Sequence, residues 1–447
     1  MPMPGVILLM PNKLYSTVEV EDMALRREER AKHQTELIKE YGLPLLCFTL
    51  NIAGPVKNSP LIGFAFKTGI ELIKERLGDS IVHFELFSAN TGCEAFVVSE
   101  LSAEELKKRM LEIEDTSPIG RWFDLDVIDI SGNKLSRSEP RRCIICGDMA
   151  AVCARSRAHS VNELQKTTNA AFAAELCRLL GRLGYDALIR EVHLSPKPGL
   201  VDELNSGANS DMDIVSFEKS AAAIEPFFVK MADKSCQYSS PADLMSMLQD
   251  IGKKAEDAMY SATDGVNTHR GAIYSLGLLI SAGARLIANG YESGVSLIEG
   301  ITKHAAELAA FQEIPETECS NGARMRMLYG VGGARAQAMN GFPAVKEALQ
   351  CYESFSKLDT HVDPWCYALL SAMSLTDDTN ALKRGGIYGA EYVKKHASEL
   401  LCKGMQLTEA DLLAFDDELI RLNISCGGAA DTLACAMFLY SLKEFFR

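Results

Sequence analysis

Two aspartates separated by one residue, in the stretch WFDLDV, are the first side chains of this sequence that could do chemistry. The surrounding segment 121–130 predicts a strand, so Asp124 and Asp126 would leave the same face of a sheet. Two carboxylates this close repel each other unless a hard cation such as Mg²⁺ holds them, an arrangement that metal-assisted phosphate chemistry uses. We therefore expect catalytic, Mg²⁺-binding roles for both, with a solvated edge strand as the alternative.

A second group of polar side chains, Cys143, Cys146, Cys153 and His159, follows a C-x2-C-x6-C-x5-H spacing. The first two cysteines have the spacing of a zinc-ligand pair, whereas the remainder does not match a common zinc-finger spacing. We therefore expect buried, reduced thiols at these positions and keep a structural zinc ion as the alternative.

Basic residues gather in the same part of the chain. From Lys134 to Arg157, six Lys or Arg stand against two acidic residues. Arginine binds phosphate through two parallel hydrogen bonds, so this stretch could hold several phosphate groups. We expect phosphate contacts from Arg121, Arg141 and Arg142.

The stretch SPKPGLVDELNSGANSDMD, residues 195–213, is a long polar loop after an apolar helical run. A long loop inside a compact domain is usually either functional or disordered. Leu200 and Val201 in its middle argue against simple disorder. We therefore expect a functional loop whose charged side chains include Lys197, Asp202, Asp211 and Asp213.

The elements that must position these residues change character along the chain. Up to residue 165, apolar strands are predicted at 44–52, 81–88, 93–99 and 121–130, with helices at 59–77 and 102–114. This β-α-β-β-α-β order predicts an α+β domain with a ferredoxin-like, or nucleotidyltransferase-like, sheet. The first and fourth strands of such a sheet are antiparallel neighbours, which would turn Lys57 toward Asp124 and Asp126 as a phosphate-binding cation.

After residue 165 the pattern is helical, with no convincing alternating strand. Helices are expected near 162–192, 215–232, 241–262, 268–289, 293–312, 322–341, 343–357, 386–402, 408–422 and 428–445. Ser240 before Pro241, and Gly290 after an apolar run, mark helix boundaries. The sequence thus predicts a multidomain protein, with an α+β domain at 1–165 and an all-α domain at 166–447.

The composition limits the class of protein. With 47% hydrophobic and 24% charged residues, the chain is typical of soluble globular proteins. Its net charge of −14 disfavours non-specific binding to nucleic acid or to a membrane surface. Thirteen cysteines, an odd number, favour reduced thiols in a cytoplasmic protein. The start MPMPGVILLMPNK lacks the features of a signal peptide or membrane span.

Several motifs of the first half resemble one family. FTLNIAGPVKNSP, GRWFDLDVID, LSR and PRRCIICGDMAAVCARSRAHSVNEL, within about residues 16–165, are similar to the holo-citrate lyase synthases, the apo-citrate lyase phosphoribosyl-dephospho-CoA transferases. The resemblance implies transfer of a phosphoribosyl-dephospho-CoA group from its triphosphate donor to a serine of the citrate lyase acyl carrier subunit, with release of pyrophosphate. Such a reaction requires a metal-binding carboxylate pair and phosphate-binding cations.

The second half resembles another family. SPKPGLVDELNSGANSDMD, GVNTHRGAIYSLG, GGARAQAMNGFP, DTNALKRGG and SCGGAADTLA are similar to the triphosphoribosyl-dephospho-CoA synthases over about residues 165–447. The resemblance implies that the ribose 2′-hydroxyl of dephospho-CoA displaces adenine from ATP, which makes the donor that the first half consumes. The chain would then combine two consecutive steps in making the citrate lyase prosthetic group.

This reaction assigns expected roles to residues of those motifs. Adenine displacement needs a base, a proton or hydrogen bond for the leaving adenine, and a grip on the triphosphate. Asp202, Asp211 and His269 are the expected catalytic residues, and Asp211 and Asp213 the expected Mg²⁺ ligands. Phosphate or substrate binding is expected from Lys197, Asn267, Arg270, Arg335, Arg384 and Asp431. For His269 the alternative is a neutral histidine in a helix turn.

Two other functions stay open at this point. The second half is also similar to the corresponding synthase of malonate decarboxylase, which makes the same donor. A non-enzymatic assembly factor for a lyase complex is the other alternative. The carboxylate pair and the Gly-rich, cation-bearing motifs favour an enzyme.

Overall fold

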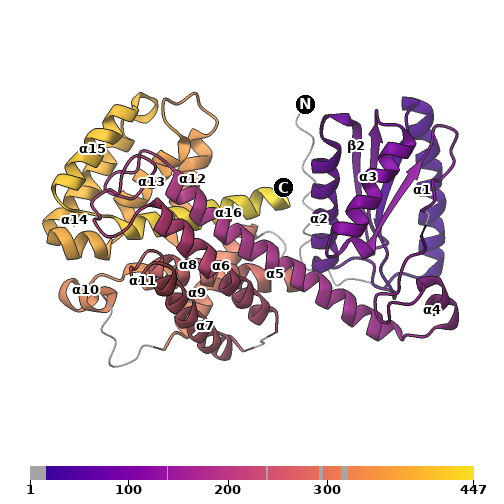
Figure 1. Cartoon of the computed structure of the whole chain (residues 1–447), viewed down its shortest axis with the longest axis horizontal. Coiled ribbons are helices and arrows are strands. Elements are labelled where there is room, and N and C mark those ends of the chain that lie inside the picture. Colours follow the sequence, from indigo (N-terminus) through magenta and orange to yellow (C-terminus); the bar gives the residue numbers. More distant parts are fainter. Residues whose placement is uncertain (1–16, 138, 238–239, 291–294, 314–320) are drawn as a thin grey trace. The chain divides into compact units, whose positions relative to one another are not determined.

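A computed structural model of the chain describes residues 17–137, 139–237, 240–290, 295–313 and 321–447. The start MPMPGVILLMPNK lies outside the described residues. Apart from two short pieces of the later chain, the protein divides into a first compact unit that ends at Leu176 and a second that begins at Cys177. Figure 1 shows that the first unit contains the sheet, whereas the second consists of helices. The expected α+β region followed by an all-α region is confirmed.

The first unit is built on a four-stranded antiparallel sheet. Its elements are α1 Val20–Tyr41, β1 Leu45–Leu50, α2 Pro60–Leu77, β2 Ile81–Ala89, β3 Gly92–Ser99, α3 Ala103–Thr116, β4 Phe123–Ile128 and α4 Ala150–Ser156. The strand order is β2-β3-β1-β4. β1 and β4 are antiparallel neighbours, as predicted, with Thr49 opposite Asp124 and Cys47 opposite Asp126.

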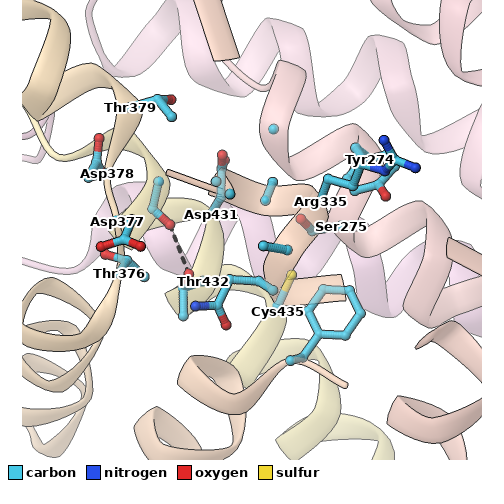
Figure 2. Close-up of a pocket in the computed structure, with 18 of the residues that line it drawn as sticks. Tyr274, Ser275, Arg335, Thr376, Asp377, Asp378, Thr379, Asp431, Thr432 and Cys435 are labelled. Atoms are coloured by element: carbon cyan, nitrogen blue, oxygen red, sulfur yellow. Dashed lines mark hydrogen bonds between the residues drawn. The ribbon is translucent and has the colours of Figure 1, made fainter. Parts of the chain in front are cut away.

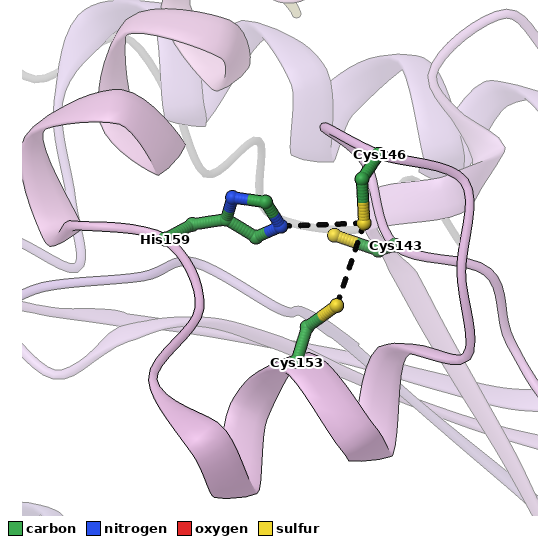
Figure 3. Close-up of side chains that lie close together, drawn as sticks. All are labelled: Cys143, Cys146, Cys153 and His159. Atoms are coloured by element: carbon green, nitrogen blue, oxygen red, sulfur yellow. Dashed lines mark hydrogen bonds between the residues drawn. The ribbon is translucent and has the colours of Figure 1, made fainter.

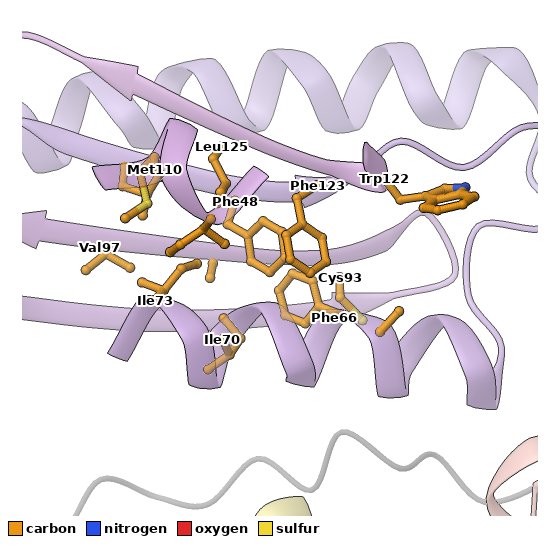
Figure 4. Close-up of a cluster of buried hydrophobic side chains, with 14 of the residues drawn as sticks. Phe48, Phe66, Ile70, Ile73, Cys93, Val97, Met110, Trp122, Phe123 and Leu125 are labelled. Atoms are coloured by element: carbon orange, nitrogen blue, oxygen red, sulfur yellow. The ribbon is translucent and has the colours of Figure 1, made fainter. Parts of the chain in front are cut away.

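The main core fills the space between one face of the sheet and helices α2 and α3 (Figure 4). Phe48 of β1 stacks on Phe66 of α2, with ring centroids 4.7 Å apart. A Cβ atom at Gly69 would lie 2.3 Å from the Phe48 ring, so only glycine lets α2 approach the strand this closely. Ser59 caps α2 by accepting from the Ile62 N–H at 3.2 Å, which confirms the predicted start of this helix.

Helix α1 covers the opposite face of the sheet and is not predicted from the sequence. Its Leu37 is the helix's buried residue and packs with Cys47 and Phe96. Most of its other side chains are charged, and Arg26 and Arg30 pair with the buried Glu94 at 2.7 and 3.1 Å. A helix that contributes so little apolar surface leaves a weak 3.6-residue hydrophobic pattern.

The second unit contains no strand among its described residues. Its helices are α5 Val161–His193, which starts in the first unit, α6 Ile214–Gln237, α7 Pro241–Ala262, α8 Arg270–Asn289, α9 Leu297–Ala310, α10 Asn321–Tyr329, α11 Gly333–Met339, α12 Pro343–Phe355, α13 Pro364–Leu375, α14 Thr379–Leu401, α15 Glu409–Arg421 and α16 Gly427–Phe446. By length and composition α8 could cross a membrane, but 78% of its apolar window is buried inside the protein. That burial is typical of a core helix.

The predicted helices agree with this arrangement except at three places. The single helix expected at 322–341 is two helices, because Gly330 adopts φ +70° between α10 and α11. The helix expected at 386–402 is the second part of α14, since Gly386 breaks this element with φ +61°, and the first part from Thr379 is not predicted. Helix α13 is not predicted, since its residues are apolar on every side and give no periodic pattern. Ser240 caps α7 as expected.

Helix α5 runs through residue 165 without interruption. Its Thr168 accepts a hydrogen bond from Trp122 Nε1 at 2.9 Å, and Phe172 meets the Trp122 ring edge-on with centroids 5.4 Å apart. A domain boundary at residue 165 would therefore separate Thr168 and Phe172 from the first unit, whose core they contact.

Candidate active sites

Asp124 and Asp126 lie on β4 with their side chains on the face opposite the main core. They alternate with the buried Phe123, Leu125 and Val127, so both carboxylates leave one face, as predicted. Asp124 Oδ1 lies 3.3 Å from Arg141 Nη2, and Asp126 is ion-paired with Lys134. Both carboxylates stay partly exposed, with exposed side-chain fractions of 39% and 25%. They are therefore open to a further ligand.

Arg141 links this pair to a buried carboxylate that the sequence analysis did not single out. Its Nη2 lies 2.8 Å from Oε1 of Glu114, which is buried on α3, and Arg137 binds the other oxygen at 3.0 Å. Burial raises the pKa of Glu114, while the charge of Arg141 opposes this shift. Glu114 thus holds Arg141 beside Asp124, and its position within a helix gave no sequence signal for this contact.

The other expected phosphate-binding cations of the first unit are arranged differently from the prediction. Lys57 donates to the carbonyl of Ile52 at 2.6 Å instead of facing the two aspartates. Burial lowers its pKa. Arg121 donates through Nε to the carbonyl of Arg142, whose own side chain is exposed. The backbone carbonyls of Ile52 and Arg142, which the sequence pattern does not reveal, hold these cations.

A cavity of about 560 Å³ lies beside Arg121 in the first unit. Its polar lining includes Asn51, Arg121, Arg157 and Ser160, and its apolar lining includes Trp122 and Leu164. Neither Asp124 nor Asp126 lines it.

Cys143, Cys153 and His159 also line this cavity. Together with Cys146 they form a cluster that is exposed or half-buried, so the expectation of buried thiols is wrong. N–H groups of Cys146 and Ile145 point at the Cys143 sulfur and lower its pKa to about 6. The segment that carries this cluster, residues 129–167, has no fully buried side chain among its described residues.

In the second unit, four of the five motifs quoted from the sequence meet at a cavity of about 430 Å³ (Figure 2). Arg270 and Tyr274 come from the start of α8, Arg335 from α11, Asp378 from the turn before α14, and Asp431 from α16. Segments more than 150 residues apart in the sequence thus share one site. The volume is within the usual range for small-molecule sites.

Two carboxylates that line the cavity are the buried Asp378 and the half-buried Asp431. Asp378 accepts from the N–H groups of Asn380 and Ala381 at 2.8 and 3.0 Å, and its other oxygen accepts from Ala429 N–H at 3.1 Å. Asp431 accepts from the backbone N–H of Ala272 at the start of α8. Burial raises the pKa of Asp431 well above its usual value, and the nearby charge of Asp378 adds to this effect. The carboxyl group of Asp431 therefore favours its protonated form.

Two cations line the cavity, and one of them has an unused donor. Arg335 donates through Nη2 to the carbonyl of Gln312 at 3.4 Å, while its buried Nε has no hydrogen-bond partner in the described part of the chain. Arg270 pairs with Glu256 at 3.0 Å, and its backbone N–H is capped by Asn267 Oδ1 at 3.2 Å. Asn267, Arg270, Arg335 and Asp431 thus lie together, as expected of substrate-binding residues.

Other expected residues do not line this cavity. Arg384 donates to the carbonyl of Ala208 and to Asn209 Oδ1, so it holds the loop 195–213. Asp213 caps α6 by accepting from the Ser216 N–H at 2.8 Å, and Asp211 is exposed. The capping role of Asp213 could have been read from the helix start that follows it.

The loop 195–213 is held together by its own charged residues. Asp202 is buried, and its two oxygens accept from Ser195 Oγ and from the N–H groups of Lys197, Leu204 and Asn205 at 2.8 to 3.0 Å. Lys197 is also buried and binds Glu191 Oε1 at 2.6 Å. Asp416 of α15 accepts from Gly199 N–H at 2.7 Å. These contacts favour a structural role for Asp202 and Lys197 in this conformation.

His269 is fully buried next to the cavity-lining Arg270. Its Nδ1 lies 2.7 Å from Ser220 Oγ, which also receives a hydrogen bond from Thr268 Oγ1 at 2.7 Å. Burial, and the positive charge of Lys197, lower its pKa to about 3. Its Nε2 has no hydrogen-bond partner among the described residues. The imidazole is therefore neutral, which agrees with the alternative reading of this residue.

The sequence analysis missed three cavity residues with useful chemistry: Asp377, Asp378 and Gln312. Asp378 begins the quoted motif DTNALKRGG, so its position was marked although no role was assigned to it. Asp377 precedes that motif directly, and Gln312 lies at the end of α9, where nothing in the sequence distinguishes it from a surface residue.

Comparison with known proteins agrees with this two-part organisation. The sequence profile of the apo-citrate lyase phosphoribosyl-dephospho-CoA transferase family, CitX, matches residues 18–174. That of the ATP:dephospho-CoA triphosphoribosyl transferase family, CitG, matches residues 177–447. Protein CitXG of Haemophilus influenzae is 35% identical to this chain, with 96% of this chain and 97% of that protein covered.

Relatives of the second half alone are also found. A 2-(5''-triphosphoribosyl)-3'-dephosphocoenzyme-A synthase of Haemophilus ducreyi is 34% identical over 67% of this chain and 99% of its own length. One from Klebsiella pneumoniae is 38% identical over 57% of this chain and 87% of its own length.

Two transferase regions in one chain define a bifunctional transferase. The chain belongs to the family in which a CitX and a CitG region are fused, and it carries both transferase activities of citrate lyase prosthetic-group biosynthesis. The resemblance inferred from the motifs is confirmed. Since both regions are transferases and the first is a citrate lyase transferase, neither the assembly factor nor the malonate decarboxylase alternative is supported.

The buried His269 makes the stability of the protein dependent on pH. Its pKa is about 3 in the folded protein and about 6.5 when unfolded, so below pH 6.5 the unfolded state binds the extra proton. The stabilisation is complete above that pH and is lost as the pH falls. Between pH 7 and pH 5 the loss is about 2 kcal/mol. We expect the His269→Gln variant to lose less of its free energy of unfolding between pH 7 and pH 5, as measured by urea unfolding. The control His361→Gln changes an exposed histidine and should show the same dependence of stability on pH as the wild type. The same dependence of unfolding free energy on pH in all three proteins would contradict this assignment.

The buried pair of Lys197 and Glu191 is expected to be structural. Lys197→Met leaves the Glu191 carboxylate buried without a partner, which typically costs about 3–5 kcal/mol. The double variant Lys197→Met/Glu191→Leu removes both charges and should recover most of the lost free energy of unfolding. The matched control is Lys395→Met, since Lys395 forms an exposed pair with Glu399 at 3.8 Å. Urea unfolding followed by circular dichroism measures the effect. An unchanged stability with a raised KM for ATP would instead indicate a phosphate-binding lysine.

Proposed function

We propose that the cavity of the second unit is where the chain converts ATP and dephospho-CoA into triphosphoribosyl-dephospho-CoA. The observation that carries this proposal is the convergence of the motifs 265–277, 332–343, 378–386 and 425–434 on one cavity. These are motifs by which the chain resembles the synthases. The loop 195–213 supports the site from outside the cavity through Asp416 and Ser425.

The triphosphate of ATP would be bound by Arg335 and Arg270. The buried, unpartnered Nε of Arg335 provides a donor for an anion. Phosphate binding by these groups would leave Lys197 and Arg384 in their structural roles.

Magnesium would enter this site with ATP. Asp377 is an exposed carboxylate of the cavity lining, paired with Lys394 at 2.5 Å, and it suits the oxygen coordination of Mg²⁺. We propose Asp377 as the Mg²⁺ ligand in place of Asp211 and Asp213, which do not line the cavity. The ion would neutralise part of the triphosphate charge.

Asp431 would supply the proton for the leaving adenine. Its carboxyl group lines the cavity, and its burial favours the protonated state. A carboxylic acid that keeps its proton near neutral pH can act as a general acid. Asp378 is less suited, because both its oxygens already accept backbone N–H groups.

In the first unit, we propose that Asp124 and Asp126 bind the Mg²⁺ that accompanies the triphosphate donor. The β-α-β-β-α-β order of a ferredoxin-like sheet, with the first strand next to the fourth, supports a nucleotidyltransferase-like role. Arg141, held between Glu114 and Asp124, would bind the pyrophosphate that leaves. The acceptor would be a serine of the citrate lyase acyl carrier subunit.

We also propose a cytoplasmic location for the protein. It is supported by the free cysteines in the described part of the chain. Substrates such as ATP and dephospho-CoA are in keeping with that compartment. The domain division we propose falls inside α5, between the two family matches and after Phe172.

The contact of Gly271 with Asp431 provides a test of the synthase site. A Cβ atom at position 271 would lie 1.9 Å from Asp431 Oδ2, so Gly271→Ala must displace this carboxyl group. We expect at least ~10-fold slower adenine release, and Asp431→Asn should slow it by about 10²-fold or more. Gly252→Ala in α7 is the matched control, since its Cβ would meet only Met231 Cε at 3.9 Å. Unimpaired release by Gly271→Ala and Asp431→Asn would exclude this cavity.

The carboxylate pair of β4 provides a test of the transferase site. Asp124→Asn or Asp126→Asn removes a charge that would bind the metal, so we expect carrier modification to fall by at least ~10²-fold when ready-made triphosphoribosyl-dephospho-CoA is supplied. Adenine release should be unchanged, because the synthase residues lie in the second unit. The exposed Asp79→Asn serves as the control. Loss of both activities in a folded variant would argue against separate sites.

A further inference from the structure

The side chains of Cys143, Cys146, Cys153 and His159 converge on one point (Figure 3). One ligand atom from each lies within 4.8 Å of those of the other three. Cys146 Sγ is 3.4 Å from Cys153 Sγ and 3.3 Å from His159 Nε2. In a tetrahedral zinc site with Zn–S bonds of about 2.3 Å, ligand sulfurs lie about 3.8 Å apart. The four atoms are therefore close to the arrangement that a zinc ion requires.

The turn between the first two cysteines has the geometry of a metal-binding knuckle. The Ile145 N–H points at Cys143 Sγ, with a nitrogen–sulfur distance of 3.5 Å. Gly147 N–H closes the turn on the Cys143 carbonyl at 3.1 Å, and Gly147 has φ +76°, which favours glycine. Backbone N–H groups directed at sulfur stabilise a thiolate, the form that binds metal.

The segment around the cluster buries little apolar surface of its own, although its Leu135 and Ile144 contact the core of the first unit. From Asp129 to Thr167, no described side chain is buried. Its apolar residues Ile145, Met149 and Val152 keep 39%, 47% and 51% of their surface exposed. A chain segment that cannot bury apolar surface usually needs a disulfide or a metal to stay ordered.

A disulfide explains the cluster less well than a metal does. A bond between Cys146 and Cys153 would leave the third thiol unused, and it would give no reason for His159 to meet the sulfurs. All four side chains have a role if they share one ion. Four protein ligands also complete the tetrahedral coordination of zinc and leave no position for substrate, which is typical of a structural site.

We propose that Cys143, Cys146, Cys153 and His159 bind one structural Zn²⁺. The ion ties the knuckle at 143–147 to α4 and to the residues that follow it. Three of the ligands line the cavity of the first unit beside Arg121 and Arg157. Arg121 is itself held by the carbonyl of Arg142, which directly precedes the knuckle. The zinc ion therefore fixes one wall of that cavity and positions its two arginines.

The consequence for activity rests on the proposed transferase function of the first unit. Loss of zinc should disorder the cavity wall and reduce transfer to the acyl carrier. Adenine release, which we assign to the second unit, should not depend on zinc. Metal content is measured without any assay of activity, so the metal site and the transferase role are tested separately.

The first experiment measures the metal in the full-length protein, purified under reducing conditions from cells supplied with zinc. We expect inductively coupled plasma mass spectrometry to find one Zn²⁺ per chain. Replacement by Co²⁺ should give the thiolate-to-metal charge-transfer band and the visible spectrum of tetrahedral cobalt. Zinc-free protein that also fails to bind added Zn²⁺ or Co²⁺, or a Cys146–Cys153 disulfide in freshly lysed cells, would overturn the proposal.

The second experiment uses variants of the full chain. Cys153→Ser and the double variant Cys143→Ser/Cys146→Ser should lose zinc and at least ~10-fold of the carrier transfer, with adenine release retained. His159→Cys, which keeps four ligands, should retain zinc. Cys402→Ser is the control, because Cys402 is an exposed cysteine outside the cluster. Undiminished zinc in the double variant would place the metal elsewhere, and full transfer without zinc would refute the role in the cavity wall.

Discussion

The start of a helix leaves backbone N–H groups that need an acceptor, and the second unit meets this need with the carboxylates of Asp378 and Asp431. Asp378 accepts from the first turns of both α14 and α16, and Asp431 accepts from the first turn of α8. These helix starts, together with α11, surround the cavity. Arg270 and Asp377, two of the residues proposed to bind ATP or its Mg²⁺, lie at the starts of α8 and α14, and the contacts of Asp431 and Asp378 stabilise those helix starts.

The two proposed sites use carboxylates in different electrostatic states. Asp124 and Asp126 lie on the outer face of a sheet, each beside a cation, and remain partly exposed. Charged carboxylates suit a metal ion. Asp431 is half-buried, and the desolvation of its carboxyl group together with the nearby charges of Asp378 and Glu191 raises its pKa, which favours a neutral acid. In the two functions that we propose, the same residue type would thus bind metal in one unit and transfer a proton in the other, and its environment would decide which.

Much of the fold follows from the sequence because its signals are local. The strands alternate in polarity, and caps such as Ser59 and Ser240 precede their helices directly. Helix α1 was missed because its face contributes little apolar surface, and α13 because it is apolar throughout. The motifs identified the cavity, since four of them line it. The roles of single charged residues were less predictable. Lys197 binds Glu191, and Arg384 binds the backbone of the loop 195–213. Nothing local in the sequence indicates whether such a cation binds another protein group or a phosphate.

The double capping by Asp378 has a consequence for how this protein can vary. Asp377 and Asp378 are neighbours with identical side chains. Asp377 is exposed and pairs with Lys394, so a different residue there would cost little unless it binds a metal. Asp378 serves two helices through its two equivalent oxygens, and asparagine, with one oxygen and one N–H₂ group, could satisfy only one of them. Across related sequences, position 378 should therefore accept no substitute, and a change there would have to be accompanied by changes at the start of both helices.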